Sequence, residues 1–266
     1  MNNDKSFIDK KRVDLLRVVR ELDSKGYMCG SSGNISIKID DNKYLITPSG
    51  IPVFMLKEDD ILLIDSDGKT IENRSDELKP SSEVFMHLFC YKKKTDIGSV
   101  IHSHAPAASA FAISGKSLDL CVMPEIVMVF GEIPLVPYTT PATKGLAEAV
   151  SDYIQKDYRA VLLENHGVLV TGNDVFDACN NLTIVETYAK TYINALTLGN
   201  VNALSQNQVA SLTELKKGLS FETTGITCGL NNLEQSGVKI NDTSENNREL
   251  TDLIADIIYK KISGQK

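Results

Sequence analysis

The sequence predicts an α/β protein with a central, mainly antiparallel sheet flanked by helices, followed by a C-terminal extension. Segments with the helical spacing of apolar residues are intermixed with short apolar strands along most of the 266 residues. Their order lacks the regular strand–helix–strand repeat that builds a parallel sheet. After Gly199 the composition becomes strongly polar, which separates an extension from the folded domain.

The first half of the chain contains a helix, several strands and a second helix. Five apolar residues form one stripe on the helix expected over residues 7–24: Leu15, Leu16, Val18, Val19 and Leu22. Residues 35–39, 44–46 and 61–64 have the pattern of short strands. A second helix is expected to open at residues 80–83 and run to about residue 93, because serine before an apolar-periodic run is a helix start signal.

The second half continues the mixture of elements. Strands are expected at residues 99–104, 133–136 and 160–164. Helices are expected over residues 105–113, 143–155 and about 174–198. We divide the chain into a folded domain of residues 1–199, a weakly structured polar linker of residues 200–248 and an amphipathic helix of residues 249–266.

Charge and composition argue against several classes of protein. The 28 Lys and Arg against 35 Asp and Glu give a net charge of −7, so we expect neither a nucleic acid nor a membrane as partner. No stretch approaches the roughly 20 apolar residues of a membrane span, and the first residues lack the apolar core of a signal peptide, which favours a cytoplasmic location. Five scattered cysteines favour reduced thiols over a disulfide framework.

Histidines carry the first chemical signal. His102 and His104 are two residues apart in an expected strand, so both imidazoles point to the same face and can converge on one metal ion. His166 follows another apolar strand and could supply a third nitrogen. Three nitrogen ligands with an open fourth position describe a catalytic zinc site. The alternative is a surface pair with a separate structural histidine.

Three segments offer hydroxyl and backbone N–H groups to a phosphate: residues 31–34 (Ser-Ser-Gly-Asn), 47–50 (Thr-Pro-Ser-Gly) and 80–82 (Pro-Ser-Ser). The third segment is at an expected helix N-terminus, where the helix dipole favours an anion. Each segment alone is also typical of an ordinary loop.

Five motifs in this order resemble the class II aldolase/adducin family, and within it the L-fuculose-1-phosphate aldolase branch. They are Gly33-Asn34-Ile35-Ser36, Thr47-Pro48-Ser49-Gly50, Pro80-Ser81-Ser82-Glu83, His102-Ser103-His104 and Asn165-His166-Gly167. The similarity covers roughly residues 7 to 198 and implies that residues 1–199 are a class II aldolase catalytic domain. It also implies a homotetramer whose zinc sites lie near subunit interfaces.

The resemblance assigns roles residue by residue. It places Zn²⁺ on His102, His104 and His166, and makes Glu83 the acid/base carboxylate, which also ligates zinc in the empty site. It places the substrate phosphate on six residues: Gly33, Asn34, Ser49, Gly50, Ser81 and Ser82.

One departure concerns the proton donor to the aldehyde oxygen, which is a tyrosine of the neighbouring subunit in the family's aldolases. The corresponding residues 121–125 read Cys-Val-Met-Pro-Glu, so Glu125 or a water is left for this role. Tyr138 is interpreted as structural because it follows a proline in a turn. His87, one helical turn after Glu83, is interpreted as a supporting or structural residue instead of a ligand.

The implied reaction is cleavage of a ketose 1-phosphate, such as L-fuculose 1-phosphate, to dihydroxyacetone phosphate and an aldehyde such as L-lactaldehyde. Alternatives within the family are a pentulose-phosphate 4-epimerase, a methylthioribulose-phosphate dehydratase and a deoxypentulose-phosphate aldolase. A non-catalytic scaffold of the adducin kind would have no reason to keep three histidines and Glu83.

The C-terminal segment has two interpretations. Six apolar residues form one helical stripe in residues 249–266: Leu250, Leu253, Ile254, Ile257, Ile258 and Ile262. The helix either docks on its own tetramer or binds a partner behind a flexible linker. It resembles the encapsulation peptides that direct enzymes to the shell proteins of bacterial microcompartments.

Overall fold

The computed structural model describes residues 2–75, 77–217, 228 and 239–240. These residues belong to two compact units, Met1–Leu118 with Ile133–Ile193, and Asp119–Glu132 with Asn194–Lys266. The first unit contains an eight-stranded sheet and every residue assigned to the metal and phosphate sites.

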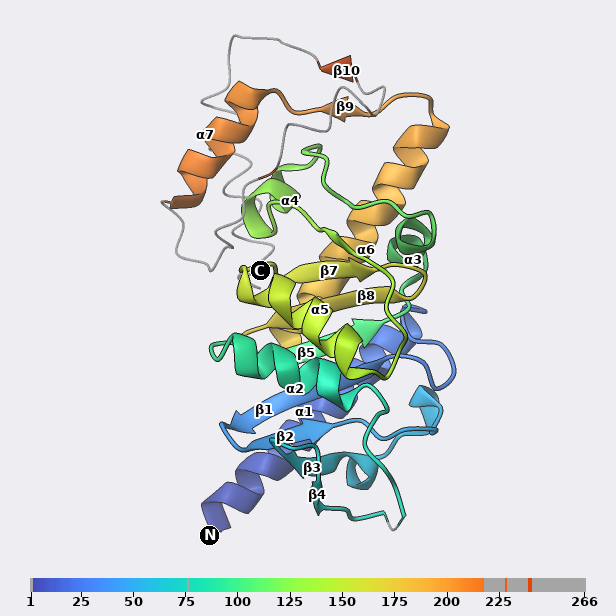
Figure 1. Ribbon diagram of the computed structural model, residues 1–266, viewed down its shortest axis with the longest axis vertical. Coiled ribbons are helices and arrows are strands. Elements are labelled where there is room, and N and C mark those ends of the chain that lie inside the picture. Colours follow the sequence, from blue (N-terminus) through green and yellow to red (C-terminus); the bar gives the residue numbers. More distant parts are fainter. Residues whose placement is uncertain (1, 76, 218–227, 229–238, 241–266) are drawn as a thin grey trace. The chain divides into compact units, whose positions relative to one another are not determined.

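The sheet has the strand order β4-β3-β2-β1-β5-β8-β7-β6 (Figure 1). The strands are β1 (Asn34–Asp40), β2 (Lys43–Ile46), β3 (Leu62–Asp65), β4 (Thr70–Glu72), β5 (Ser99–Ser103), β6 (Leu135–Val136), β7 (Ala160–Leu163) and β8 (Gly167–Gly172). All neighbours in this sheet are antiparallel except β6 and β7, which are parallel. The prediction of a mainly antiparallel central sheet is therefore confirmed.

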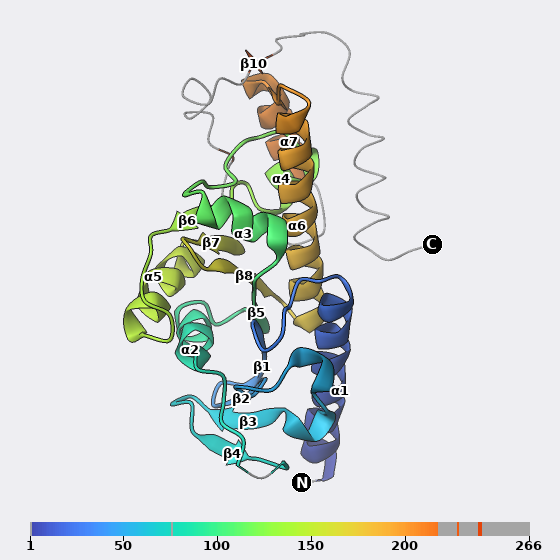
Figure 2. The same cartoon turned by 90° about the vertical axis from the view of Figure 1, so that its right-hand side faces the viewer.

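Helices cover both faces of this sheet. They are α1 (Asn2–Ser24), α2 (Val84–Lys93), α3 (Pro106–Ile113), α5 (Lys144–Gln155) and α6 (Val175–Thr197), with short 3₁₀ helices η1 (Val53–Met55) and η2 (Glu58–Asp60). Figure 2 shows α2 and α5 together on one face, and α1 and α6 on the other. The histidine-bearing strand β5 lies in the middle of the sheet, between β1 and β8.

Helix α5 shows how the sequence produces this layer. Its apolar residues Leu146, Val150 and Ile154 recur every four positions and are buried against the sheet and α2. Its first turn is capped by Thr143, whose hydroxyl accepts a hydrogen bond from the Leu146 N–H at 3.3 Å.

The second unit contains α4 (Pro124–Val129), β9 (Asn202–Ala203), α7 (Gln206–Lys217) and β10 (Lys239–Ile240). Side chains of α4 and α7 form its small apolar cluster, with Val127 and Met128 against Val209 and Leu212. A disulfide joins Cys121 to Cys228 across 107 residues of sequence. The prediction that all five cysteines are reduced thiols is wrong for this pair.

Helix α7 corrects the interpretation of residues 200–248 as weakly structured throughout, because residues 206–217 are helical. Its apolar residues are few and form a narrow stripe in a polar sequence, so the helix is stabilised mainly by packing on α4. The predicted helix of residues 249–266 lies outside the described residues.

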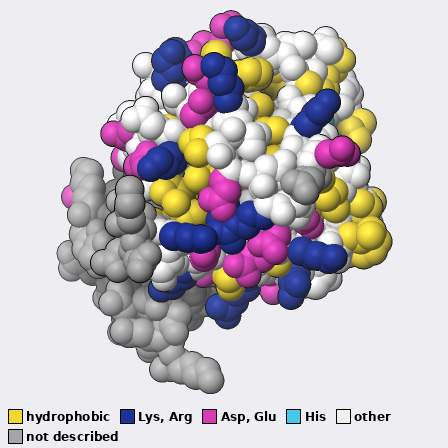
Figure 3. Space-filling model, turned by 90° about the horizontal axis from the view of Figure 1, so that it is seen from below, with side chains coloured by type: hydrophobic (Ala, Val, Ile, Leu, Met, Phe, Trp, Pro, Cys, Tyr) yellow, Lys and Arg dark blue, Asp and Glu magenta, His cyan; other side chains and the backbone are white. Residues whose placement is uncertain are grey.

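The described helices include none long and apolar enough to cross a membrane. The molecular face in Figure 3 carries Lys and Arg side chains close to Asp and Glu side chains.

Candidate metal centre and active site

Three histidines meet at one end of the central strands. His102 lies in β5, His104 follows that strand, and His166 occupies the turn between β7 and β8. Because β5 and β8 are hydrogen-bonded neighbours, the turn before β8 is brought beside the end of β5. One potential ligand atom from each of the three side chains lies within 4.8 Å of the others.

The turn that carries His166 has a specific backbone requirement. Asn165 has a φ of 55°, in the left-handed region that asparagine tolerates better than most residues. At Gly167 an added Cβ would lie 2.5 Å from the Ser103 carbonyl oxygen, so only glycine allows β8 to approach the end of β5 this closely. The Asn-His-Gly sequence is thus needed to bring His166 to the other two histidines.

The donor atoms fit a metal ion. His102 Nδ1 lies 3.0 Å from the Val168 carbonyl and donates its proton there, so its Nε2 presents a lone pair. That Nε2 lies 3.2 Å from His104 Nε2 and 3.3 Å from a Glu83 carboxylate oxygen. Ligand atoms bound at 2.0–2.1 Å around a tetrahedral zinc are about 3.3 Å apart. A cation at this point would satisfy atoms that otherwise repel one another.

Glu83 completes the cluster from the start of α2. It is the residue before the helix, yet its side chain does not cap the helix and instead faces His102 and His166. Its Oε1 atom is buried without a hydrogen-bond partner among the described residues. Asn34 Nδ2 donates a hydrogen bond to the other oxygen at 3.0 Å.

The electrostatics keep the cluster ready to bind a cation. Burial lowers the pKa of His102 to about 3 and also lowers the pKa of His104, so both imidazoles are neutral at pH 7. Burial would raise the pKa of Glu83, but its contacts with the neighbouring His102 imidazole and the hydrogen bond from Asn34 lower it below its ordinary value. Glu83 is therefore a carboxylate beside the neutral imidazole of His102.

The structure brings the three candidate phosphate segments together beside this cluster. The Ser49 N–H donates to the Lys79 carbonyl at 2.9 Å, and the Ser81 N–H donates to the Thr47 carbonyl at 3.2 Å. The Thr47 hydroxyl accepts from the Ile35 N–H at 3.1 Å. Residues 47–50 therefore bridge residues 33–35 and 79–82.

The six residues predicted to bind the phosphate differ in how exposed they are and in the hydrogen bonds they already make. Ser49, Gly50 and Ser82 are exposed. Ser81 is buried, and its hydroxyl accepts a hydrogen bond from the Glu83 N–H at 3.3 Å. Gly33 has a φ of +84°, and an added Cβ would lie 3.0 Å from the His102 carbonyl oxygen.

The remaining predicted residues fall outside the cluster. Glu125 belongs to α4 in the second unit. Tyr138 is 56% exposed, and its N–H donates to Glu164 Oε2 at 2.8 Å. His87 is fully buried and contacts Asn34 and Ser36 through its two nitrogens, which agrees with a supporting role instead of metal ligation.

Sequence comparison decides the family. Residues 13–193 match the family described as Class II Aldolase and Adducin N-terminal domain, which is well over half of the chain. The chain belongs to this family. The prediction that the protein is a class II aldolase, a lyase, is confirmed at the level of this family, whose members here include aldolases and a decarboxylase.

Curated relatives of this class II aldolase differ in the activities for which they are named. An L-fuculose phosphate aldolase of Methanocaldococcus jannaschii is 35% identical over 190 residues, covering 71% of this chain and 98% of the relative. A 5-deoxy-D-ribulose 1-phosphate aldolase of Bacillus thuringiensis serovar kurstaki is 32% identical, covering 79% and 97%. A 3-oxo-tetronate 4-phosphate decarboxylase of Haemophilus influenzae is 31% identical, covering 67% and 84%.

A solved structure with a related sequence has the same fold. A solved L-fuculose 1-phosphate aldolase structure superposes with a TM-score of 0.71 at 31% identity, covering 78% of this chain and 96% of that chain.

Proposed function

We propose that this class II aldolase catalyses the zinc-dependent cleavage of a ketose 1-phosphate, such as L-fuculose 1-phosphate, to dihydroxyacetone phosphate and an aldehyde such as L-lactaldehyde. The observation that carries the proposal is the convergence of three imidazoles and one carboxylate beside three segments suited to a phosphate. The full-length relatives that act on fuculose phosphate and 5-deoxyribulose phosphate support it.

His102, His104 and His166 would hold the zinc ion, with Glu83 beside them. When bound, zinc supplies a Lewis acid that polarises a carbonyl group. The three imidazoles would hold the ion beside the Glu83 carboxylate.

Glu83 is the base and acid of the proposal. In the synthetic direction its carboxylate removes a proton from the carbon next to the ketone carbonyl. In the cleavage direction the hydroxyl group on the other side of the breaking carbon–carbon bond loses its proton as that half becomes the aldehyde. Glu83 takes up one proton in exchange and delivers it to the carbon next to the ketone carbonyl, so the protons balance. Because Glu83 is partly buried, its pKa depends on the neighbouring His102 and Asn34 side chains.

The phosphate is proposed to bind where residues 33–34, 49–50 and 81–82 meet. Ser49, Gly50 and Ser82 are exposed there, and the positive end of the α2 dipole favours an anion. The Asn34 side chain is held by its hydrogen bonds to Glu83 and His87, so we expect its contribution to phosphate binding to come from the backbone.

Assembly and location belong to the same proposal. We expect a homotetramer in the cytoplasm, with the catalytic domain in residues 1–199. Residues 249–266 either dock on that tetramer or direct the enzyme to a microcompartment shell protein. Fusion of residues 240–266 to a fluorescent protein in cells that make shell proteins separates the two: diffuse fluorescence would contradict targeting.

The decisive experiment is a substrate screen with purified protein whose zinc content has been measured. L-Fuculose 1-phosphate, 5-deoxy-D-ribulose 1-phosphate and related ketose 1-phosphates are supplied, and released dihydroxyacetone phosphate is measured. We expect stoichiometric zinc and cleavage of at least one ketose 1-phosphate, lost with a chelator and restored by zinc. A preference for 5-deoxy-D-ribulose 1-phosphate would favour the alternative function as a deoxypentulose-phosphate aldolase, the activity for which the Bacillus relative is named. Full activity without metal would contradict the proposal.

A further inference from the structure

A chain of buried hydrogen bonds leads from Glu83 into the core between β1 and α2. Asn34 Nδ2 donates to Glu83 Oε2 at 3.0 Å, and Asn34 Oδ1 lies 2.5 Å from His87 Nε2. His87 Nδ1 lies 2.7 Å from Ser36 Oγ, which is 2.7 Å from the Tyr91 hydroxyl. Asn34, Ser36, His87 and Tyr91 are at most 5% exposed.

Chemistry fixes the direction of every bond in this chain. The Glu83 carboxylate only accepts, so Asn34 presents its NH₂ group to Glu83 and its carbonyl oxygen to His87. His87 must then carry its proton on Nε2, which leaves Nδ1 as an acceptor for the Ser36 hydroxyl. Ser36 has one proton, so Tyr91 donates to Ser36. All four donors point toward Glu83.

This chain of hydrogen bonds is suited to hold the Asn34 and Glu83 side chains in a fixed orientation, not to transport a proton. It passes through the amide of Asn34, which does not exchange protons readily, so a proton cannot travel along it to Glu83. Asn34 is paired with His102 across β1 and β5, which sets the amide directly beside the histidine cluster. Glu83 immediately precedes α2, and His87 lies one helical turn later in it. Asn34 and Ser36 share one face of β1. The chain therefore connects the two elements that carry the carboxylate and its amide donor.

We propose that His87 is a positioning residue: its Nε2–H fixes the Asn34 amide so that the amide holds the Glu83 carboxylate beside the histidine cluster. This inference rests on the proposed function for its kinetic consequence. The ring nitrogens of His87 contact only Asn34 and Ser36, so its effect on Glu83 passes through Asn34.

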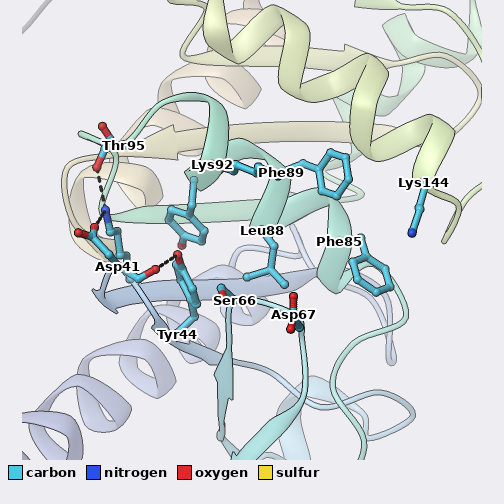
Figure 4. Close-up of a pocket in the computed structure, with 12 residues that line it drawn as sticks. Asp41, Tyr44, Ser66, Asp67, Phe85, Leu88, Phe89, Lys92, Thr95 and Lys144 are labelled. Atoms are coloured by element: carbon cyan, nitrogen blue, oxygen red, sulfur yellow. Dashed lines mark hydrogen bonds and ion pairs between the residues drawn. The ribbon is translucent and has the colours of Figure 1, made fainter.

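Tyr91 is the outer end of the chain. Its ring packs against Tyr44 with centroids 4.9 Å apart, and both rings line a cavity of about 920 Å³ that contains none of the candidate site residues (Figure 4). Loss of the Tyr91 hydroxyl leaves the three bonds nearer Glu83 in place. Tyr91→Phe is therefore the matched control for a change in the same core.

The kinetic test compares two carboxamides at one position. A glutamine amide reaches the place of imidazole Nε2 and can donate to Asn34, whereas the shorter asparagine amide reaches only the place of Nδ1. We expect kcat of His87→Asn to fall about 10–100-fold, as is common when a buried partner of a site residue is lost. KM should stay within about threefold, and kcat of His87→Gln and Tyr91→Phe within about fivefold of wild type. Equal kcat values for His87→Asn and His87→Gln would overturn the proposal.

Crystal structures of the same two variants test positioning without turnover. The Asn34–Glu83 hydrogen bond should persist in His87→Gln and be lost in His87→Asn; an unchanged bond in both overturns the proposal. If His87→Asn does not fold, Asn34→Asp removes the Asn34 Nδ2–H donor to Glu83 with little change of shape, and wild-type kcat in that variant would equally contradict the proposal. A wild-type protein that cleaves no ketose phosphate would contradict the proposed function. The crystal structures of the variants would still show whether His87 positions Asn34 and Glu83.

Discussion

Two fully buried histidines, His87 and His102, differ in what their nitrogens face. Both nitrogens of His87 have complementary partners, Asn34 on one side and Ser36 on the other. His102 has a complementary partner only at Nδ1, while its Nε2 faces another imidazole nitrogen and a carboxylate. A buried imidazole with two satisfied nitrogens stabilises a structure, whereas converging lone pairs require a cation. This difference is the basis for proposing His87 as a positioning residue and His102 as a metal ligand.

The largest effect is expected for His102→Ala, which tests whether His102 holds the metal ion and His87 does not. The variant should lose zinc and lose cleavage almost completely, because two imidazoles hold a catalytic zinc poorly. The fold should remain, since the core of this unit does not depend on the metal. Metal analysis, activity and thermal melting measure the three outcomes. Stoichiometric zinc with full activity would show that His102 is not a ligand, and His87→Gln is the control expected to keep its zinc.

Glu83→Gln should leave zinc and substrate binding largely intact but lower kcat about 10²–10⁴-fold, the usual range for loss of a general acid/base. The amide keeps the shape of the carboxylate but cannot take up and return a proton. Steady-state kinetics with a metal determination on the same sample checks this. A kcat within threefold of wild type would remove Glu83 from the chemistry.

The stability of the protein should depend on pH through His87. Burial lowers its pKa from 6.5 to about 4, so between these values the unfolded chain binds a proton that the folded protein does not. This contribution to stability is present above pH 6.5 and is lost as pH falls toward 4. The corresponding free energy is about 3 kcal/mol.

Denaturant unfolding at pH 7 and pH 4 measures this effect in wild type and His87→Gln. Both proteins keep the other histidines, so the smaller acid destabilisation expected for His87→Gln reports His87 alone. Identical losses of unfolding free energy in the two proteins would contradict the assignment of His87 as a buried neutral imidazole.

Ser82→Ala should produce the smallest of these effects and act only on phosphate binding. Loss of one hydrogen bond to a charged phosphate costs about 1.5–3 kcal/mol, so KM for the phosphorylated ketose should rise about tenfold or more. Ser82 is exposed, so its removal leaves the start of α2 intact, whereas Ser81→Ala also removes the acceptor of the Glu83 N–H. An equal KM change for an unphosphorylated analogue would place the phosphate elsewhere.

Local patterns were sufficient for most elements of the first unit. The apolar stripe of α1, the serine start signal of α2 and the buried strand β5 lie where the sequence predicts them, within a few residues. Strand β8 was not predicted, because the Asn-His-Gly turn looked like the end of an apolar segment and the next strand begins at its glycine. Helix α7 and the Cys121–Cys228 disulfide were missed because both depend on packing between segments far apart in sequence.

The sequence by itself determined which chemical groups are candidates for the site: residue types at fixed spacing within β5, the Asn165–Gly167 turn and the start of α2 predict three imidazoles, a carboxylate and hydroxyls suited to an anion. Spacing along one strand or helix fixes which side chains share a face. Only the tertiary structure decided how these faces meet. The pairing of β1 with β5 sets Asn34 opposite His102, and the packing of α2 gives Asn34 a second partner in His87. Such contacts join residues about fifty positions apart, and no local spacing rule encodes them because they arise from strand pairing and helix packing.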